Sequence, residues 1–169
     1  MPTQFFEKTL GGALLALALL VVGCSSDSVM EIPEPGGGMM NNAVVWDGAT
    51  VTFEKAANAD PSDAANQDRL TDNVWLTRGN DGGQIYNAKT ESNFNKNSSP
   101  AGTQWALGTL DNVENLNFSS FRDAVGSPKD VVGKDLVLFL AEDNIFLSVK
   151  FTEWSANKAG SFAYERSSE

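Results

Sequence analysis

Residues 135–154, with the sequence DLVLFLAEDNIFLSVKFTEW, decide the fold of this chain. Residues 136–141 are apolar at every position, which is typical of a central strand covered on both faces. Glu142, Asp143 and Asn144 follow as a turn signal. From 145 to 152, Ile, Leu, Val and Phe alternate with Phe, Ser, Lys and Thr. That period of two predicts a second strand, and the whole stretch predicts a β-hairpin.

Short β-branched and aromatic runs lie on both sides of this hairpin, separated by turn residues such as Asp47-Gly48. We expect strands at 43–46, 50–53, 73–78, 84–87, 104–108 and 161–166, with 116–118 either a strand or the approach to a helix. One short helix is expected at 121–125, ended by Gly126 and Pro128. The polar stretches 56–72 and 88–103 are expected to be loops, the first with at most one helical turn. About seven to nine short strands predict an all-β fold, an antiparallel β-sandwich or jelly roll.

The composition excludes several classes of function. The 169 residues carry 12 Lys and Arg against 22 Asp and Glu, for a formal net charge of -10. Nucleic-acid phosphates require clustered basic residues, so we expect no nucleic-acid partner. The chain has no histidine, which removes Ser-His-Asp catalysis and His-ligated zinc. Its one cysteine, Cys24, excludes an intrachain disulfide.

Residues 1–23 have the pattern of a targeting segment. Lys8 precedes an apolar run at 13–22, which as a helix would span about 15 Å, half of a bilayer's hydrocarbon core. That length is typical of a signal peptide and too short for a membrane-spanning helix. Residues 24–42 are rich in Pro, Gly, Ser and acidic side chains, which predicts a flexible tether. Residues 43–169 then form the β domain.

The end of the targeting segment reads Val21-Val22-Gly23-Cys24. This pattern resembles the lipobox of bacterial lipoproteins. The resemblance implies cleavage before Cys24 and attachment of acyl chains such as palmitate to it, so that lipid holds the protein on a membrane. Ser25 resembles the outer-membrane sorting signal of Gram-negative lipoproteins. The expected location is therefore the outer membrane, with the domain in the periplasm or at the cell surface.

Five segments of the β domain carry a second resemblance, and they are 72–80, 85–87, 99–106, 135–154 and 160–167. Together they resemble an uncharacterised β-rich module of secreted and cell-surface proteins of environmental bacteria such as Bacteroidota. The resemblance implies an extracellular address and a β fold. It brings no catalytic residues.

Aromatic side chains are the candidate ligand-binding residues. Trp75, Tyr86, Trp105 and Trp154 each lie in an expected strand or at its end. Aromatic faces can cover the apolar faces of sugar rings, which would suit a polysaccharide ligand. The alternative is that these rings pack in the core, where most aromatic area is buried.

Calcium is a candidate cofactor, with Asn80, Asp81, Asp143 and Asn144 as the candidate ligands. Calcium takes about six to eight oxygen ligands from carboxylates, amides and carbonyls. Asn and Asp are also the residues that turns favour for backbone reasons, so turn formation is the alternative.

The expected function is non-catalytic: binding of a polysaccharide or another surface protein, or a structural role. The alternative is a small carbohydrate-active hydrolase, which would need two carboxylates facing each other across a sugar. The acids considered are Asp123, Glu142, Asp143 and Glu153, and none follows an apolar pattern that would bury it.

Replacing Cys24 by Ser is expected to move the protein from the membrane fraction to the soluble fraction, because the acylated sulfur is lost. Cell fractionation with immunodetection measures this, and Ser26→Ala, which leaves the lipobox intact, is the control. A Cys24→Ser protein that stays on membranes without detergent would contradict the lipoprotein prediction.

Overall fold

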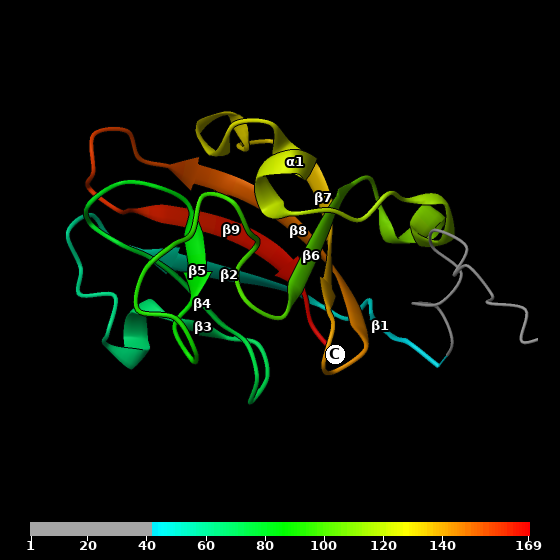
Figure 1. Cartoon of the computed structure of the whole chain (residues 1–169). Coiled ribbons are helices and arrows are strands. Elements are labelled where there is room, and N and C mark those ends of the chain that lie inside the picture. The colour runs from blue at the N-terminus through cyan, green and yellow to red at the C-terminus, as the bar shows by residue number, and fades with distance from the viewer. Residues whose placement is uncertain (1–41) are drawn as a thin grey trace, which may run out of the picture. The chain divides into compact units, whose positions relative to one another are not determined.

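The computed structural model describes residues 42–169, and most of this part of the chain is β structure (Figure 1). The strands are β1 (Val44–Trp46), β2 (Thr50–Lys55), β3 (Asp68–Arg69), β4 (Trp75–Arg78), β5 (Ile85–Asn87), β6 (Thr103–Leu107), β7 (Asp135–Leu140), β8 (Ile145–Trp154) and β9 (Phe162–Ser167). The helices are α1 (Phe121–Val125) and the 3-10 helices η1 (Ala64–Asn66), η2 (Leu110–Asn115) and η3 (Pro128–Asp130). The predicted all-β class is confirmed.

A large sheet has the strand order β2-β9-β8-β7-β6, and all of these neighbours are antiparallel. The predicted hairpin forms its centre as β7 and β8, with Leu140 opposite Ile145 beside the turn. β1 pairs with β8 in parallel, an arrangement that the sequence did not predict. It is possible because β8 is longer than its neighbour β9: β9 pairs from Val149 onward, which leaves residues 145–147 free for β1.

A small sheet of β3, β4 and β5 forms the second layer. Figure 1 shows it over the β2–β9 side of the large sheet, with α1 over β6 and β7. β3 lies within the polar stretch that was expected to be a loop, so that expectation is wrong there. The strand has only two residues, Asp68 and Arg69, and no apolar pattern reveals it. Residues 116–118 form no strand and lead from η2 to α1.

Two apolar clusters cover the two faces of the large sheet. The cluster between the sheets contains Leu70, Val74, Leu76 and Ile85 from the small layer, and Trp105, Leu136, Leu138, Leu140, Leu147, Val149, Phe151, Phe162 and Tyr164 from the large sheet. The cluster on the far face contains Val137, Phe139 and Phe146, covered by Leu110, Val113, Leu116 and Phe118. Successive residues of β7 therefore enter opposite clusters, which explains why residues 136–140 are apolar throughout.

Phe151 lies at the centre of the cluster between the sheets. It is fully buried, and its ring centroid lies 5.8 Å from that of Phe121, 5.6 Å from that of Trp154 and 5.2 Å from that of Tyr164. Aromatic pairs at such distances add to the stabilisation that comes from burial alone. The central position makes Phe151 the side chain whose loss the sandwich tolerates least.

Replacing Phe151 by Ala is expected to lower the free energy of unfolding by about 3–5 kcal/mol, because it leaves a cavity among rigid aromatic rings. Val132→Ala, at a side chain that is 48% exposed, is the control and should change it by less than about 0.5 kcal/mol. Equilibrium urea unfolding measures both. Equal effects of the two substitutions would contradict this account of the core.

Candidate functional site

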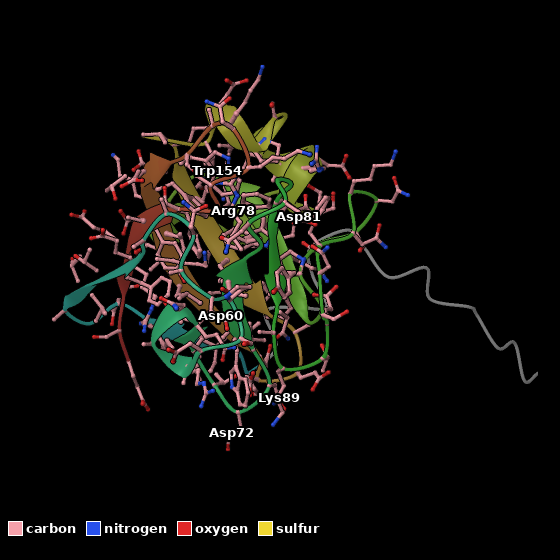
Figure 2. The ribbon with its side chains drawn as sticks, turned by 90° about the vertical axis from the view of Figure 1, so that its left-hand side faces the viewer. Asp60, Asp72, Arg78, Asp81, Lys89 and Trp154 are labelled. Atoms are coloured by element: carbon pink, nitrogen blue, oxygen red, sulfur yellow. The ribbon has the colours of Figure 1, made fainter. Side chains whose placement is uncertain are left out.

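A cavity of about 400 Å³ lies beside Trp154, at the end of β8. Four segments that are distant in sequence form its walls. They are β4 with its following loop (Arg78, Gly82, Gly83), α1 (Arg122), residues 127–129 around the start of η3, and the turn between β8 and β9 (Ser155, Ala156, Asn157, Lys158). Figure 2 shows Trp154 and Arg78 next to each other at this end of the domain.

Arg78 holds the walls of this cavity together. The residue is 3% exposed, and its Nε donates to the carbonyl oxygen of Gly83 at 3.1 Å. Its Nη1 donates to the carbonyl of Ser161 at 2.9 Å, and its Nη2 to that of Ser155 at 3.2 Å. The guanidinium carbon lies 4.0 Å from the ring centroid of Trp154, a cation–π contact. Arg78 thus fixes the indole and both ends of the β8–β9 turn.

The acceptors of Arg78 are all neutral oxygens, so its charge is buried without a carboxylate partner. Neither of the two ion pairs formed among residues 42–169 involves it. Burial accordingly lowers the pKa of Arg78 to about 10. The side chain still carries its charge at neutral pH and directs a positive potential into the cavity.

A second buried cation, Lys55, lies close to the β8–β9 turn. Its side chain is fully buried, and its Nζ donates to Oδ1 of Asn80 at 2.9 Å and to the carbonyl of Gly160 at 3.2 Å. Burial lowers the pKa of Lys55, and the charge of Arg78 lowers it further. The two cations therefore act on each other, and both are held by neutral acceptors close to the β8–β9 turn.

Three further cations line the cavity, namely Arg122, Lys129 and Lys158. The Nε atom of Arg122 is buried and has no hydrogen-bond partner within residues 42–169. No Asp or Glu is among the residues that line this cavity. The lining also includes an apolar wall, from Trp154 and Pro128. The arrangement can hold a ligand that combines an apolar face with oxygen acceptors.

The four predicted aromatic residues do not form one platform. Trp154 lines the cavity described above, whereas Trp105 is fully buried, with its Nε1 donating to Thr103 Oγ1 at 3.0 Å. Trp105 is therefore a core residue, and its prediction as a ligand-binding residue is wrong. The apolar alternation of β6 could not distinguish an inward indole from an exposed one.

Trp75 and Tyr86 lie together, at a separate cavity of about 390 Å³. The ring of Trp75 is covered by two cations: the guanidinium carbon of Arg69 lies 4.0 Å from its centroid and Nζ of Lys89 lies 4.6 Å from it. Tyr86 is only 4% exposed. The aromatic surface open to a ligand is therefore smaller here than the sequence suggested.

The four predicted calcium ligands lie at opposite ends of β8. Asn80 contacts Lys55 near the β8–β9 turn, and a cation at its Oδ1 is unfavourable for calcium binding there. Asp143 precedes β8 and accepts hydrogen bonds from Thr71 Oγ1 at 2.7 Å and Asn73 Nδ2 at 2.9 Å. The two halves of the predicted set therefore cannot share one ion.

The other members of the set also have structural roles. Asp81 accepts a hydrogen bond from Asn93 at 2.9 Å, and Asn144 adopts a positive φ of 55° in the turn between β7 and β8. Such a backbone conformation is one that Asn tolerates better than most residues. Within the described part of the chain, no three His, Cys, Asp or Glu side chains are grouped as metal ligands would be.

Three of the four acids considered for hydrolysis, Asp123, Asp143 and Glu153, have hydrogen-bond partners of their own, and Glu142 is exposed in the turn before β8. Glu153 accepts from Ser161 Oγ at 2.7 Å, and Asp123 from Ser120 Oγ at 2.7 Å at the start of α1. Asp135 and Glu165 line one cavity of about 200 Å³, but Asp135 is 60% exposed and forms an ion pair with Lys150 at 3.0 Å. Neither Asp135 nor Glu165, both exposed, has the apolar surroundings that a general acid requires.

The functional residues that the sequence did not predict are the buried cations Arg78 and Lys55, and Arg122, whose buried Nε has no hydrogen-bond partner within residues 42–169. A signal for Arg78 is present in the sequence. Val74, just before β4, and Leu76 and Arg78 within it are every second residue along the chain, and Val74 and Leu76 are core residues. A period of two therefore places the arginine inward as well. Lys55 and Arg122 carry no comparable signal.

No family model matches the chain, and no curated protein or solved structure matches it. Cys24 with the predicted lipobox, the predicted targeting segment 1–23 and all but the last residue of the predicted tether 24–42 lie outside the described residues. Within 42–169, no helix is long and apolar enough to cross a membrane. The function is therefore argued from the site itself.

The chain's two tyrosines predict a loss of stability in alkali. Burial raises the pKa of Tyr164 well above 10, and its contact with Asp68 raises it further. Burial also raises the pKa of Tyr86, with a further contribution from Asp81. As the pH rises, the unfolded chain therefore loses its phenolic protons before the folded chain does. The stabilisation that comes from the two protonated tyrosines is complete below a pH of about 10 and is lost as the pH rises through their raised pKa values.

We expect the tyrosinate absorbance of the folded protein to stay low at a pH of about 10, where about half of the phenols are ionised in denaturant. The lowered pKa values of Lys55 and Arg78 make the free energy of unfolding rise with pH, which is opposite to the effect of the tyrosines. Comparing the wild type with Tyr164→Phe therefore isolates the contribution of Tyr164. That variant should show a shallower fall of the free energy of unfolding above this pH. Ionisation of both tyrosines at their usual pKa before unfolding would contradict the prediction.

Proposed function

We propose that this chain is a lipid-anchored bacterial envelope protein whose β domain is a non-catalytic binding module, with a saccharide bound at the Trp154 cavity. The observation that carries the proposal is the cavity itself. It combines a partly exposed indole with several hydrogen-bonding groups, as sites for small polar ligands do.

The walls of the cavity suit the two kinds of surface that a sugar presents. Trp154 and Pro128 offer apolar surface for the C–H face of a pyranose ring. Ser127, Ser155 and Asn157 lie around them and can bond with hydroxyl groups. Because Arg78 fixes the indole and the turn before a ligand arrives, little side-chain freedom would be lost on binding.

The lipobox supports the cellular setting of this proposal. Acylation of Cys24 and a tether over residues 24–42 would present the domain in the periplasm or at the cell surface, where polysaccharides are abundant. A non-catalytic role agrees with the lack of acidic residues in the cavity lining.

Trp154→Leu is expected to weaken polysaccharide binding about ten-fold, a change that corresponds to about 1.4 kcal/mol. Leu keeps apolar volume against Phe121 and Phe151 but removes the flat surface for a sugar. Affinity electrophoresis through gels loaded with bacterial or algal polysaccharides measures the binding. The matched control is Trp46→Leu, a half-buried indole of β1 that does not line the cavity.

Thermal unfolding of both variants shows whether the fold is retained. Equal retardation of wild type and a folded Trp154→Leu would contradict binding at this cavity, and free migration of wild type in every gel would contradict saccharide binding altogether. A cleared zone that follows the protein band would reveal hydrolysis and overturn the non-catalytic assignment.

A further inference from the structure

The cavity beside Trp154 has a charge opposite to that of the chain as a whole. The sequence has a formal net charge of -10, yet the lining contains Arg78, Arg122, Lys129 and Lys158 and no acid. These cations come from β4, from α1, from η3 and from the β8–β9 turn. They are distant in sequence, so only the folded chain brings them to one cavity.

None of the acids close to these cations in sequence forms an ion pair with them, and Asp130, next to Lys129, has an exposed side chain that does not line the cavity. Asp123, next to Arg122, bonds with Ser120 Oγ on its own helix. Glu153, next to Trp154, accepts from Ser161 Oγ, and Asp81, in the loop after β4, accepts from Asn93 and lines a different cavity. No ion pair among residues 42–169 therefore involves the four cations of the cavity, and no carboxylate lines the cavity beside them.

Arg122 supplies the most specific feature of the site. Its side chain lines the cavity, and its Nε is a buried donor for which residues 42–169 provide no acceptor. A buried donor without an acceptor is destabilising, because it has lost its hydrogen bonds to water and gained none in return. The planar guanidinium matches two oxygens of one anionic group, and such charge-assisted pairs are stronger than neutral hydrogen bonds.

We infer that the saccharide bound at this cavity is anionic, with its carboxylate or sulfate oxygens held by Arg122, Lys129 and Lys158 while its ring lies against Trp154. The inference rests on the proposed function and names the class of its ligand. A neutral sugar would leave the guanidinium group of Arg122 and the two ammonium groups without an anionic partner.

The overall charge of the chain makes this inference sharply testable. Away from the cavity, a polyanion is repelled by a protein of charge -10. The net charge of the chain therefore opposes its retention by an acidic polymer. At an ionic strength of about 0.15 M, charges more than about 8 Å apart are screened, so the cations in contact with the ligand dominate.

The experiment compares polymers that differ only in charge. The full chain, extracted in a non-ionic detergent, is run through affinity gels of polygalacturonate and of its methyl ester, and of dextran sulfate and dextran. We expect retardation by at least one acidic polymer to exceed that by its neutral counterpart about ten-fold in affinity, and to weaken as salt is raised. The carboxylate and sulfate arms distinguish the two sources of negative charge.

Variants that remove one charge locate the binding. Arg122→Gln should weaken binding to the acidic polymer about ten-fold and leave binding to the neutral one unchanged. The matched control, Lys96→Gln, removes the same charge from an exposed loop outside the cavity and should change the affinity less than about two-fold. Lys129→Gln with Lys158→Gln, both at exposed side chains, provides a second test should Arg122→Gln unfold.

The outcomes separate this inference from the function on which it rests. Trp154-dependent binding that is equal for acidic and neutral polymers would overturn the inference and keep saccharide binding. Equal losses in Arg122→Gln and Lys96→Gln would also overturn it, because the effect would then follow net charge alone. Free migration in all four gels would overturn both.

Discussion

The buried guanidinium of Arg78 is the interaction on which the candidate site depends. It donates to main-chain oxygens of Gly83, Ser155 and Ser161, and thereby joins the loop after β4 to both ends of the β8–β9 turn. A lysine could not make these bonds at once, since it lacks the planar fork of donors. The same group lies over the indole of Trp154. Turn, loop and aromatic wall are thus held by one side chain.

Polar contacts of this kind recur where the small sheet meets the large one. Asp68 of β3 accepts from the Tyr164 hydroxyl and from Arg166 Nε, both at 2.7 Å, across the two layers. Lys55 of β2 reaches Asn80 beyond β4. The small sheet has few residues and contributes few apolar side chains, so these directional bonds fix its position on the apolar core.

The sequence predicted the parts of the fold whose patterns are local. The hairpin of residues 135–154 and the helix at 121–125 follow from periodicity and from the Gly126 and Pro128 breakers, and both are present. The parallel β1–β8 pair and the two-residue β3 were missed, because each depends on contacts between distant segments. For the site, Trp154 was among the predicted residues. The cations around it were not. The alternation along β4 could have placed Arg78 inward, but Arg122, Lys129 and Lys158 have no pattern in sequence that distinguishes them from other surface residues.

The parallel pairing of β1 has a mechanical consequence. β1 pairs with residues 145–147 at the start of β8, whereas Trp154 and its cavity lie at the end of that strand, about 30 Å away for ten extended residues. β1 runs in the same direction as β8, so its first residue points away from the cavity. If the proposed ligand is bound while the chain before residue 42 is held, tension between the two would run along β8 and load the β1–β8 hydrogen bonds in shear. Bonds loaded in shear must break together, whereas bonds that are peeled apart break one at a time.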